Sequence, residues 1–289
     1  MRPSSFDYHK ATSLDHALAL LAEFGEEGRP IAGGQSLVPM MNLRLARPGH
    51  LVDINALPLD GIERRGDILH VGALVRHHRY LADPLIAAHF PAFLEAVHWI
   101  GHPTIRNHGS LGGSISHADP TAELPAVCLL YDATIIASST AGDRRIAARD
   151  FFLGAYVTSL EPGEMVTAVE FPIPPAASTG AFVELGERRG DFAIASVGVV
   201  LHWSGRQITR AAVVCSGAKL VPIRAGEIEA LLVGRQLDAP DAAAAGRRFA
   251  DSVEPASDHS GSSSYRKPLI GELTRRTIER ACQQALDIA

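Results

Sequence analysis

Two glycine-rich segments constrain this chain more than any other feature of its sequence. We call residues 32–37 (AGGQSL) the first glycine loop and residues 109–114 (GSLGGS) the second glycine loop. Adjacent glycines let the backbone turn freely and let N–H groups approach a ligand closely. A run of such N–H groups forms an anion-binding concavity, above all where a helix follows. Taken alone, one Gly-Gly pair is equally compatible with a tight strand-to-helix turn.

The presence of two such loops favours one shared ligand, because each loop can hold one side of a diphosphate. Neither loop fits the G-x-G-x-x-G pattern of a Rossmann turn, and neither ends in the Gly-Lys-Ser/Thr of a P-loop. A Rossmann-type site and a nucleoside triphosphate site are therefore disfavoured. FAD is the common diphosphate ligand that remains.

Composition and charge exclude several other classes of protein. The 289 residues suffice for one large domain or for two to three smaller ones. A net charge of -5 argues against nucleic-acid binding, which requires a basic surface. No signal peptide and no apolar run long enough to span a membrane stand in the sequence. Cys128, Cys215 and Cys282 lie far apart in apolar stretches, which excludes a local thiolate metal motif and favours buried free thiols in a reducing cytoplasm.

Hydrophobic periodicity predicts helices and strands in alternation up to a linker at residues 172–180. A capped helix is expected at residues 12–25, and a strand then enters the first glycine loop. A helix from Ser36 to Ala46 should follow. Further on, helical sequence is broken by Pro84 and Pro91, and another helix opens near Asp119.

Beyond the linker the pattern changes to three antiparallel strands followed by closing helices. The pattern as a whole favours an α/β fold with a smaller α+β tail. Residues 257–265 are expected to form a flexible loop. The expected strands lie at 181–189, 194–203 and 208–217, and the expected helices at 223–234, 239–251 and 265–288.

Residues 32–54 and 101–125, which contain the two glycine loops, resemble the FAD-binding medium subunit of the molybdenum hydroxylases, the carbon monoxide dehydrogenase and xanthine dehydrogenase type enzymes. Residues 6–25, 188–201 and 265–281 resemble other parts of the same subunit, so the resemblance spans the chain. It implies an α+β fold with a two-subdomain FAD-binding domain of the PCMH type (vanillyl-alcohol-oxidase-like) and a C-terminal domain with a small antiparallel sheet and helices. The implied boundaries are 1–175, with subdomains of about 1–57 and 58–175, and 176–289.

The resemblance also implies which residues hold FAD. The first glycine loop would contribute Ala32, Gly33, Gly34, Gln35, Ser36 and Leu37. The opposite side would contribute Thr104, Gly109, Ser110, Gly112, Gly113 and Ser114. Outside the loops, Glu123 is expected near the sugar or adenine, His117 beside the cofactor, Phe192 near the isoalloxazine ring, and Met165 and Val166 in the pocket wall. No catalytic or metal-binding residue is expected. The first glycine loop offers neither His nor Cys for covalent attachment, so FAD is expected to be non-covalent.

The chemistry implied by the resemblance is electron transfer within a hetero-oligomer. A large subunit with a molybdenum cofactor would hydroxylate the substrate, and a small subunit would carry two [2Fe-2S] clusters. FAD in this chain would accept their electrons and pass them to an external acceptor. A free-standing FAD-dependent oxidoreductase and a non-catalytic binding module remain as alternatives. The sequence identifies neither the substrate nor the final acceptor.

Two residues depart from the pattern of the relatives. Phe192 stands where some relatives have tyrosine, and Glu184 stands where some have lysine. A carboxylate at residue 184 would disfavour the anionic reduced flavin if it lay near the ring.

Several polar residues have plain structural explanations. His98 and His102 show the i, i+4 spacing of metal ligands, but a glycine and a proline interrupt the helix there and no glutamate accompanies them. The pair His77-His78 is expected at a solvated helix start. Arg275 and Arg276 are expected on an exposed face.

Overall fold

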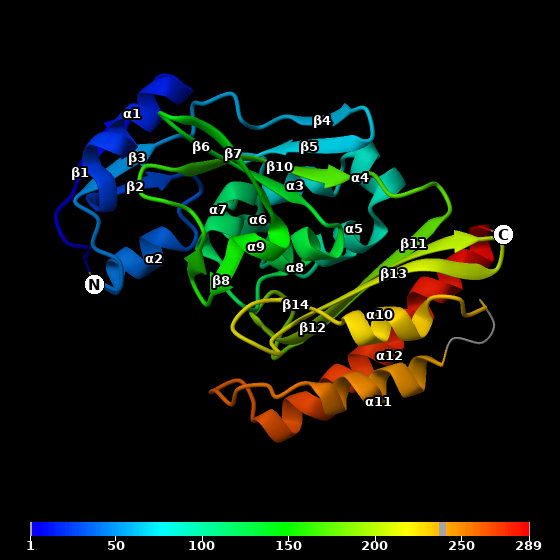
Figure 1. Cartoon of the computed structure of the whole chain (residues 1–289). Helices are drawn as coiled ribbons and strands as arrows, with labels where there is room; N and C mark the ends of the chain where they lie inside the picture. Colours follow the sequence, from blue (N-terminus) through cyan, green and yellow to red (C-terminus); the bar gives the residue numbers. More distant parts are fainter. Residues whose placement is uncertain (1, 237–240, 289) are drawn as a thin grey trace.

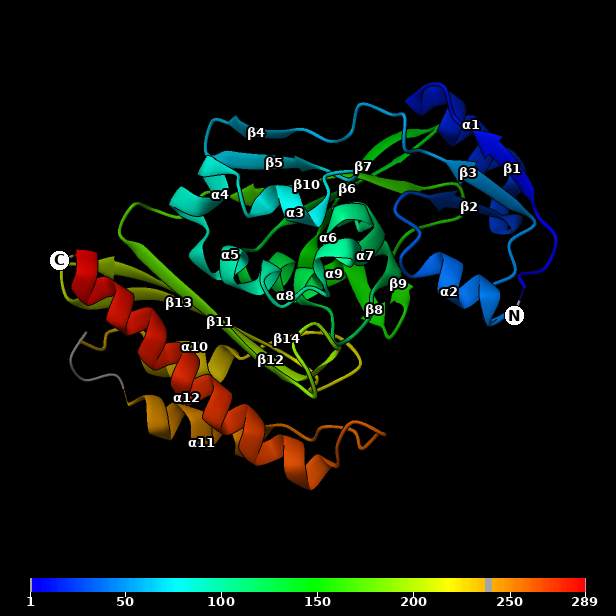
Figure 2. The same cartoon turned by 180° about the vertical axis from the view of Figure 1, so that it is seen from behind.

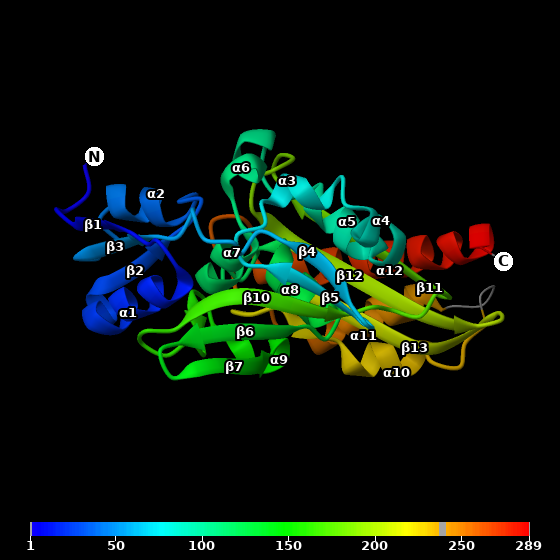
Figure 3. The same cartoon turned by 90° about the horizontal axis from the view of Figure 1, so that it is seen from above.

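Three sheets follow one another along the chain and organise the molecule. The computed structural model describes residues 2–236 and 241–288. The first sheet lies at one end, the second in the middle, and the third with the last helices at the other end (Figure 3).

The first sheet is parallel, with strand order β1-β3-β2, and α1 packs on it. The predicted caps of α1 are confirmed: the Ser13 hydroxyl accepts the His16 N–H, at 3.1 Å, and Gly25 has a φ of 51°. The elements of this part are β1 (Asp7–Lys10), α1 (Leu14–Phe24), η1 (Gly25–Glu27), β2 (Gly28–Ile31), α2 (Leu37–Asn42) and β3 (His50–Asp53).

Helix α2 is shorter than expected. It ends at Asn42, so the predicted extension to Ala46 is wrong. Arg44 has a φ of 59°, in the left-handed region, and the N–H of Leu45 returns to the carbonyl of Met40, at 2.8 Å. This turn closes the helix and leads the chain toward β3.

The second sheet is antiparallel, with order β4-β5-β10-β6-β7, and helices cover one of its faces. The predicted breaks at Pro84 and Pro91 are confirmed, and each proline is the first residue of a new helix. The helices are α3 (His77–Tyr80), α4 (Pro84–His89), α5 (Pro91–Val97), α6 (Pro103–His108), α7 (Leu111–His117), α8 (Glu123–Leu130) and α9 (Ala148–Phe151). The strands are β4 (Ile62–Arg65), β5 (Ile68–Gly72), β6 (Thr134–Ser139), β7 (Gly142–Ala147) and β10 (Met165–Pro172), with β8 (Phe152–Gly154) and β9 (Val157–Thr158) forming a separate pair.

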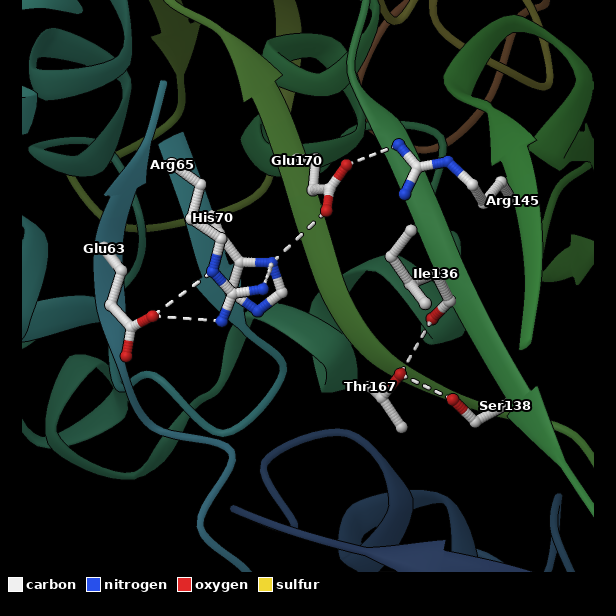
Figure 4. A network of polar contacts seen from close by, with 8 residues as sticks. All are labelled: Glu63, Arg65, His70, Ile136, Ser138, Arg145, Thr167 and Glu170. Atoms are coloured by element: carbon white, nitrogen blue, oxygen red, sulfur yellow. Dashed lines mark hydrogen bonds and ion pairs between the residues drawn. The ribbon is translucent and has the colours of Figure 1, made fainter. Parts of the chain in front are cut away.

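The two faces of the second sheet differ in chemistry. Leu69 and Val71 of β5 are fully buried in the main core. Between them His70 points to the other face, where its Nδ1 lies 3.5 Å from a Glu170 oxygen (Figure 4). The second oxygen of Glu170 accepts a hydrogen bond from Arg145, at 2.5 Å. This alternation follows from the period of two along a strand and directs the helices to the apolar face.

The third sheet is antiparallel, with order β11-β12-β13-β14, as predicted for the segment beyond the linker. One face of this sheet packs against α5 and α8, and α12 runs along the other face (Figures 1 and 2). The elements are β11 (Ser178–Gly186), β12 (Ala193–Ser204), β13 (Gln207–Ser216), β14 (Ile223–Arg224), α10 (Gly226–Leu232), α11 (Ala242–Ser252) and α12 (Ser263–Ile288). The predicted start of α11 at residues 239–240 lies outside the described residues.

No helix in the described part of the chain is long and apolar enough to cross a membrane. The three cysteines are free and buried, as expected.

Candidate functional site

A cleft of about 1190 Å³ lies where the three parts of the chain meet. Its walls combine the first glycine loop, the second glycine loop with α7, the start of β10, and residues 187 and 190–192 between β11 and β12. A cleft of this volume is at or above the upper end of ordinary ligand pockets and has room for a large cofactor.

The first glycine loop supplies free hydrogen-bond donors to this cleft. Gly34 has a φ of 67°, and the Gln35 side-chain amide donates to the carbonyl of Gly33, at 2.9 Å. Within the described residues, no backbone N–H of residues 33–37 donates to another protein group. Unpaired N–H groups in one loop make a binding site for an anion.

The two glycine loops touch at Gly33. A Cβ at this residue would lie 1.9 Å from the carbonyl oxygen of His108, far inside van der Waals contact. Only glycine allows the backbones to approach this closely. The first loop is therefore held directly against the segment that enters the second loop.

The second glycine loop is the beginning of a helix, which differs from the expected symmetrical pair of cradles. Helix α7, which was not predicted, starts inside the loop, and the Ser110 hydroxyl accepts the N–H of Gly113, at 3.3 Å. The helix expected to open near Asp119 is α8, which begins at Glu123. The N–H of Gly112 donates to the carbonyl of Ala73, at 2.8 Å, and a Cβ at Gly112 would meet the Ala73 Cβ at 2.7 Å. These glycines mainly serve close packing, and most N–H groups here are used by the protein itself.

Two residues that the sequence analysis missed brace the loops. Arg76 donates to the carbonyl of His108, at 2.7 Å, and to the side-chain oxygen of Asn55, at 2.5 Å. Asn55 in turn donates to the carbonyl of Ala32, at 3.1 Å. No local pattern marks either residue, because the bridge joins segments that are far apart in the sequence.

His77 is buried under the second glycine loop, so the prediction of a solvated His77 is wrong. Its side chain is 4% exposed, and a Cβ at Gly109 would lie 2.6 Å from the imidazole. Burial, together with neighbouring positive charge, lowers the pKa of His77 to about 3. The imidazole is therefore neutral and acts as a packing support.

Most of the residues expected around the cofactor line the cleft together. Thr104 is absent from the described lining, although the adjacent Ile105 is present. The expected residues found in the cleft wall are Ala32, Gly33, Gly34, Gln35, Ser36, Leu37, Gly109, Ser110, Gly112, Gly113, Ser114, His117, Glu123, Met165, Val166 and Phe192.

One wall of the cleft is acidic. Glu123 begins α8, and burial raises the pKa of its carboxyl to about 7, with a further contribution from Asp119. Glu184 lies outside the described lining; burial, and after it Glu123, raises the pKa of Glu184 to about 9. Burial therefore favours the un-ionised form of Glu184 at neutral pH, and an effect of this residue on the reduced flavin stays a prediction.

His117 belongs to a small polar cluster in the same wall. Its ring lies 5.0 Å from the ring of Tyr156, and the Tyr156 hydroxyl donates to Asp119, at 3.1 Å. Burial lowers the pKa of His117, so a neutral imidazole is favoured. Asp119 and Tyr156 also line the cleft but carry no recognisable signal in the sequence.

The C-terminal part closes one end of the cleft. Phe192 lies in this wall with 72% of its surface exposed. His259 and Ser260, which were not predicted, also reach the cleft. Their segment, expected to be a flexible loop, contains a turn that is fixed by two hydrogen bonds from Arg266 to Asp258, at 2.6 and 2.7 Å.

His98 and His102 do not share a helix. His98 directly follows α5 and His102 directly precedes α6, with Gly101 between them at a φ of 45°. Across residues 2–236 and 241–288, no group of three or more His, Cys, Asp or Glu side chains is arranged to hold a metal ion. Arg276 is exposed, as expected, whereas Arg275 is partly buried, and both pair with Glu272 of their own helix.

A large cleft with a loop of free N–H groups is suited to a diphosphate-containing cofactor. Residues 4–174 match the family model of the FAD binding domain in molybdopterin dehydrogenase, and residues 180–281 match that of the CO dehydrogenase flavoprotein C-terminal domain.

Individual relatives match over nearly the whole chain. Subunit alpha of the 6-hydroxypseudooxynicotine dehydrogenase complex of Paenarthrobacter nicotinovorans is 40% identical, over 99% of this chain and 97% of that subunit. The carbon monoxide dehydrogenase medium chain of Afipia carboxidovorans is 39% identical, over 99% of both chains. In the crystal structure of quinoline 2-oxidoreductase from Pseudomonas putida 86, a chain with 36% identity superposes with a TM-score of 0.94, covering 99% of this chain and 100% of that one.

The chain belongs to the FAD-binding medium subunits of the molybdenum hydroxylases, such as carbon monoxide dehydrogenase. It is thus a subunit of an oxidoreductase, and its cofactor is FAD.

Proposed function

We propose that this chain accepts electrons from two [2Fe-2S] clusters of a small partner subunit and passes them to an external acceptor. A large subunit with a molybdenum cofactor would supply these electrons by hydroxylating the substrate. FAD, when bound, provides the redox centre, and the chain binds it, orients it and shields it from water. The division into residues 1–175 for FAD binding and 176–289 for the C-terminal domain is part of this proposal.

The observation that carries the proposal is the row of unpaired N–H groups in the first glycine loop. At Gly33 this loop has no space for a side chain, so its position against the second loop is fixed. We assign the diphosphate to these N–H groups, since they are donors without a protein partner. Ser36 and Ser110, which both line the cleft, can add hydroxyl donors.

The remaining cleft residues have distinct proposed roles. Glu123 would accept hydrogen bonds from cofactor hydroxyl groups, and the buried side chains of Met165 and Val166 would form an apolar wall. Phe192 would cover the isoalloxazine at the exposed end of the cleft. Thr104 remains a prediction as a ligand, since its neighbour Ile105 takes that place in the wall.

Non-covalent binding follows from the chemistry of the first glycine loop. It contains neither histidine nor cysteine, so no nucleophile for flavin attachment is present there. A location in the reducing cytoplasm agrees with three free cysteines and is likewise part of the proposal.

The substrate of the whole enzyme lies outside what this subunit determines. The relatives carry names that refer to compounds as different as carbon monoxide, 6-hydroxypseudooxynicotine and quinoline. Such different substrates are combined with closely similar medium subunits, so the choice of substrate belongs to another subunit.

Purification of the native complex tests the proposed function. The chain is isolated from its own cells under mild conditions, and iron, molybdenum and flavin are quantified in the same fraction. We expect about four iron atoms per flavin, as two [2Fe-2S] clusters require, together with molybdenum. A chain that carries FAD without iron, and that itself oxidises a substrate, would instead be the free-standing oxidoreductase.

A further inference from the structure

A row of buried polar side chains crosses the third sheet. Glu184 on β11 pairs with Ser196 on β12, which pairs with Ser216 on β13. Directly opposed residues on neighbouring antiparallel strands hold their Cβ atoms about 4.5–5.5 Å apart on one face. Glu184 is 4% exposed and the two serines are 0% exposed, so all three lie in the interior.

None of these three side chains has its hydrogen-bonding capacity filled. One carboxyl oxygen of Glu184 and the hydroxyls of Ser196 and Ser216 have no partner among the described residues. Buried polar groups are normally satisfied, and exceptions concentrate where a protein has a function for them. Neither the fold nor the binding of the diphosphate explains why this row is polar.

The row lies on the face of the third sheet that packs against α8, the helix that begins in the cleft wall. It is on the same face of the third sheet as Phe182 and Val214, which belong to the core shared with α8. Helix α8 begins at Glu123, and Glu123 lines the cleft. Glu184 thus lies on the sheet face that packs against α8, and the Glu123 carboxyl at the start of this helix is close enough to raise the pKa of Glu184.

The charged groups that shift the pKa of either carboxyl are all acidic. Glu123 is the charged group that raises the pKa of Glu184, and Asp119 is the charged group that raises the pKa of Glu123. No cation is among the groups that shift either carboxyl in the described chain. Two close carboxyls without a cation do not both ionise near neutral pH, and the more deeply buried one retains the proton longer as the pH rises. The pKa values agree with this order of ionisation, because the pKa of Glu184 is about 9 and that of Glu123 is about 7.

We propose that Glu184 is a positioning residue for FAD: it holds a proton behind Glu123, so that Glu123 faces the cofactor hydroxyl groups as the only ionised carboxyl of the pair. This inference rests on the proposed role of the cleft as the FAD site. Ionisation of Glu184 places a second negative charge behind Glu123 and opposes binding of the cofactor, which is itself an anion.

The affinity of the FAD-free chain for FAD, measured by titration at pH 7.5 and pH 9.5, tests the inference. If the bound form requires the proton on Glu184, a pKa of about 9 makes the Kd of the wild type rise about four-fold over this interval. Glu184→Gln is neutral at both pH values and has the shape of the protonated acid. We expect its Kd at pH 7.5 to equal that of the wild type and to lack this four-fold rise.

Glu23→Gln is the matched control, because Glu23 is an exposed residue of α1. It makes the same Glu-to-Gln change far from the row and should reproduce the wild-type rise. The inference is overturned if wild type and Glu184→Gln respond identically to pH, or if Glu184→Gln weakens binding already at pH 7.5. A wild-type chain that takes up no FAD at either pH overturns the proposed function itself.

Infrared spectroscopy of the wild type gives a second readout that does not depend on a folded variant. An un-ionised carboxylic acid has a carbonyl stretch distinct from that of a carboxylate. We expect this band at pH 7.5 and its decrease at pH 9.5. Its absence at pH 7.5 overturns the inference.

Discussion

Replacing Gly33 by alanine tests the contact that fixes the first glycine loop. The new Cβ would lie 1.9 Å from the His108 carbonyl oxygen, whereas ordinary van der Waals contact begins at 3.4 Å. The loop must therefore move by about 1.5 Å. This oxygen belongs to the backbone and also accepts a hydrogen bond from Arg76, so it cannot rotate away as a side chain would.

The displacement has two measurable consequences. Overpacking of this kind costs about 1–3 kcal/mol, which lowers the Tm by roughly 2–12 °C for a domain of this size. Hydrogen bonds from N–H groups to oxygen require donor–acceptor distances of about 2.7–3.2 Å, so a loop displaced this far no longer holds the diphosphate. We expect the affinity for FAD to fall at least about ten-fold, equivalent to about 1.4 kcal/mol.

Gly226→Ala serves as the control in the same experiment. A Cβ at Gly226, the first residue of α10, meets no atom within 4 Å. Its Tm and FAD affinity should match those of the wild type or show slight stabilisation. Wild-type FAD affinity in Gly33→Ala, measured by fluorescence titration alongside this control, would refute the proposed contact between the loops.

Two further predictions concern buried charge. Arg266→Met removes both hydrogen bonds to Asp258 and should destabilise the protein by about 1.5–3 kcal/mol in urea unfolding, with faster proteolysis at residues 257–265. The control Lys267→Met, at an exposed ion pair, should change stability by less than about 1 kcal/mol. Equal effects of the two substitutions would contradict this prediction. The pKa of Glu184 is about 9 in the folded state, whereas it is near 4.5 in the unfolded chain. Between these pH values the folded state binds more protons than the unfolded state, so stability falls as pH rises. The free energy of unfolding of the FAD-free wild type should therefore decrease more steeply from pH 6 to pH 8 than that of Glu184→Gln, by up to about 1.4 kcal/mol per pH unit; parallel slopes would contradict it.

The features that could be predicted from the sequence have a local cause. The caps of α1, the prolines that begin α4 and α5, and the antiparallel strands of the third sheet each depend on residues adjacent in the chain. The glycine loops were recognisable for the same reason. The family resemblance then supplied what no local pattern contains, namely the identity of the cofactor.

The features that were missed have causes far apart in the sequence. The bridge from Arg76 through Asn55 joins the two loops only after the first and second sheets have docked. The sequence suggested a solvated His77 because its neighbours in the chain are polar. In the structure, Gly109, more than 30 residues further along the chain, packs against the His77 imidazole. Glu184 acquires its neutral state from Glu123 on another element and from burial in the third sheet.

The most direct test of the central claim is an absorption spectrum of the purified chain, followed by acid precipitation and chromatography of the supernatant. We expect a flavin spectrum, a colourless pellet, and about one FAD per chain released in the supernatant. A colourless chain that takes up no added FAD would contradict the assignment of the cleft. Colour that remains in the pellet would contradict the non-covalent attachment.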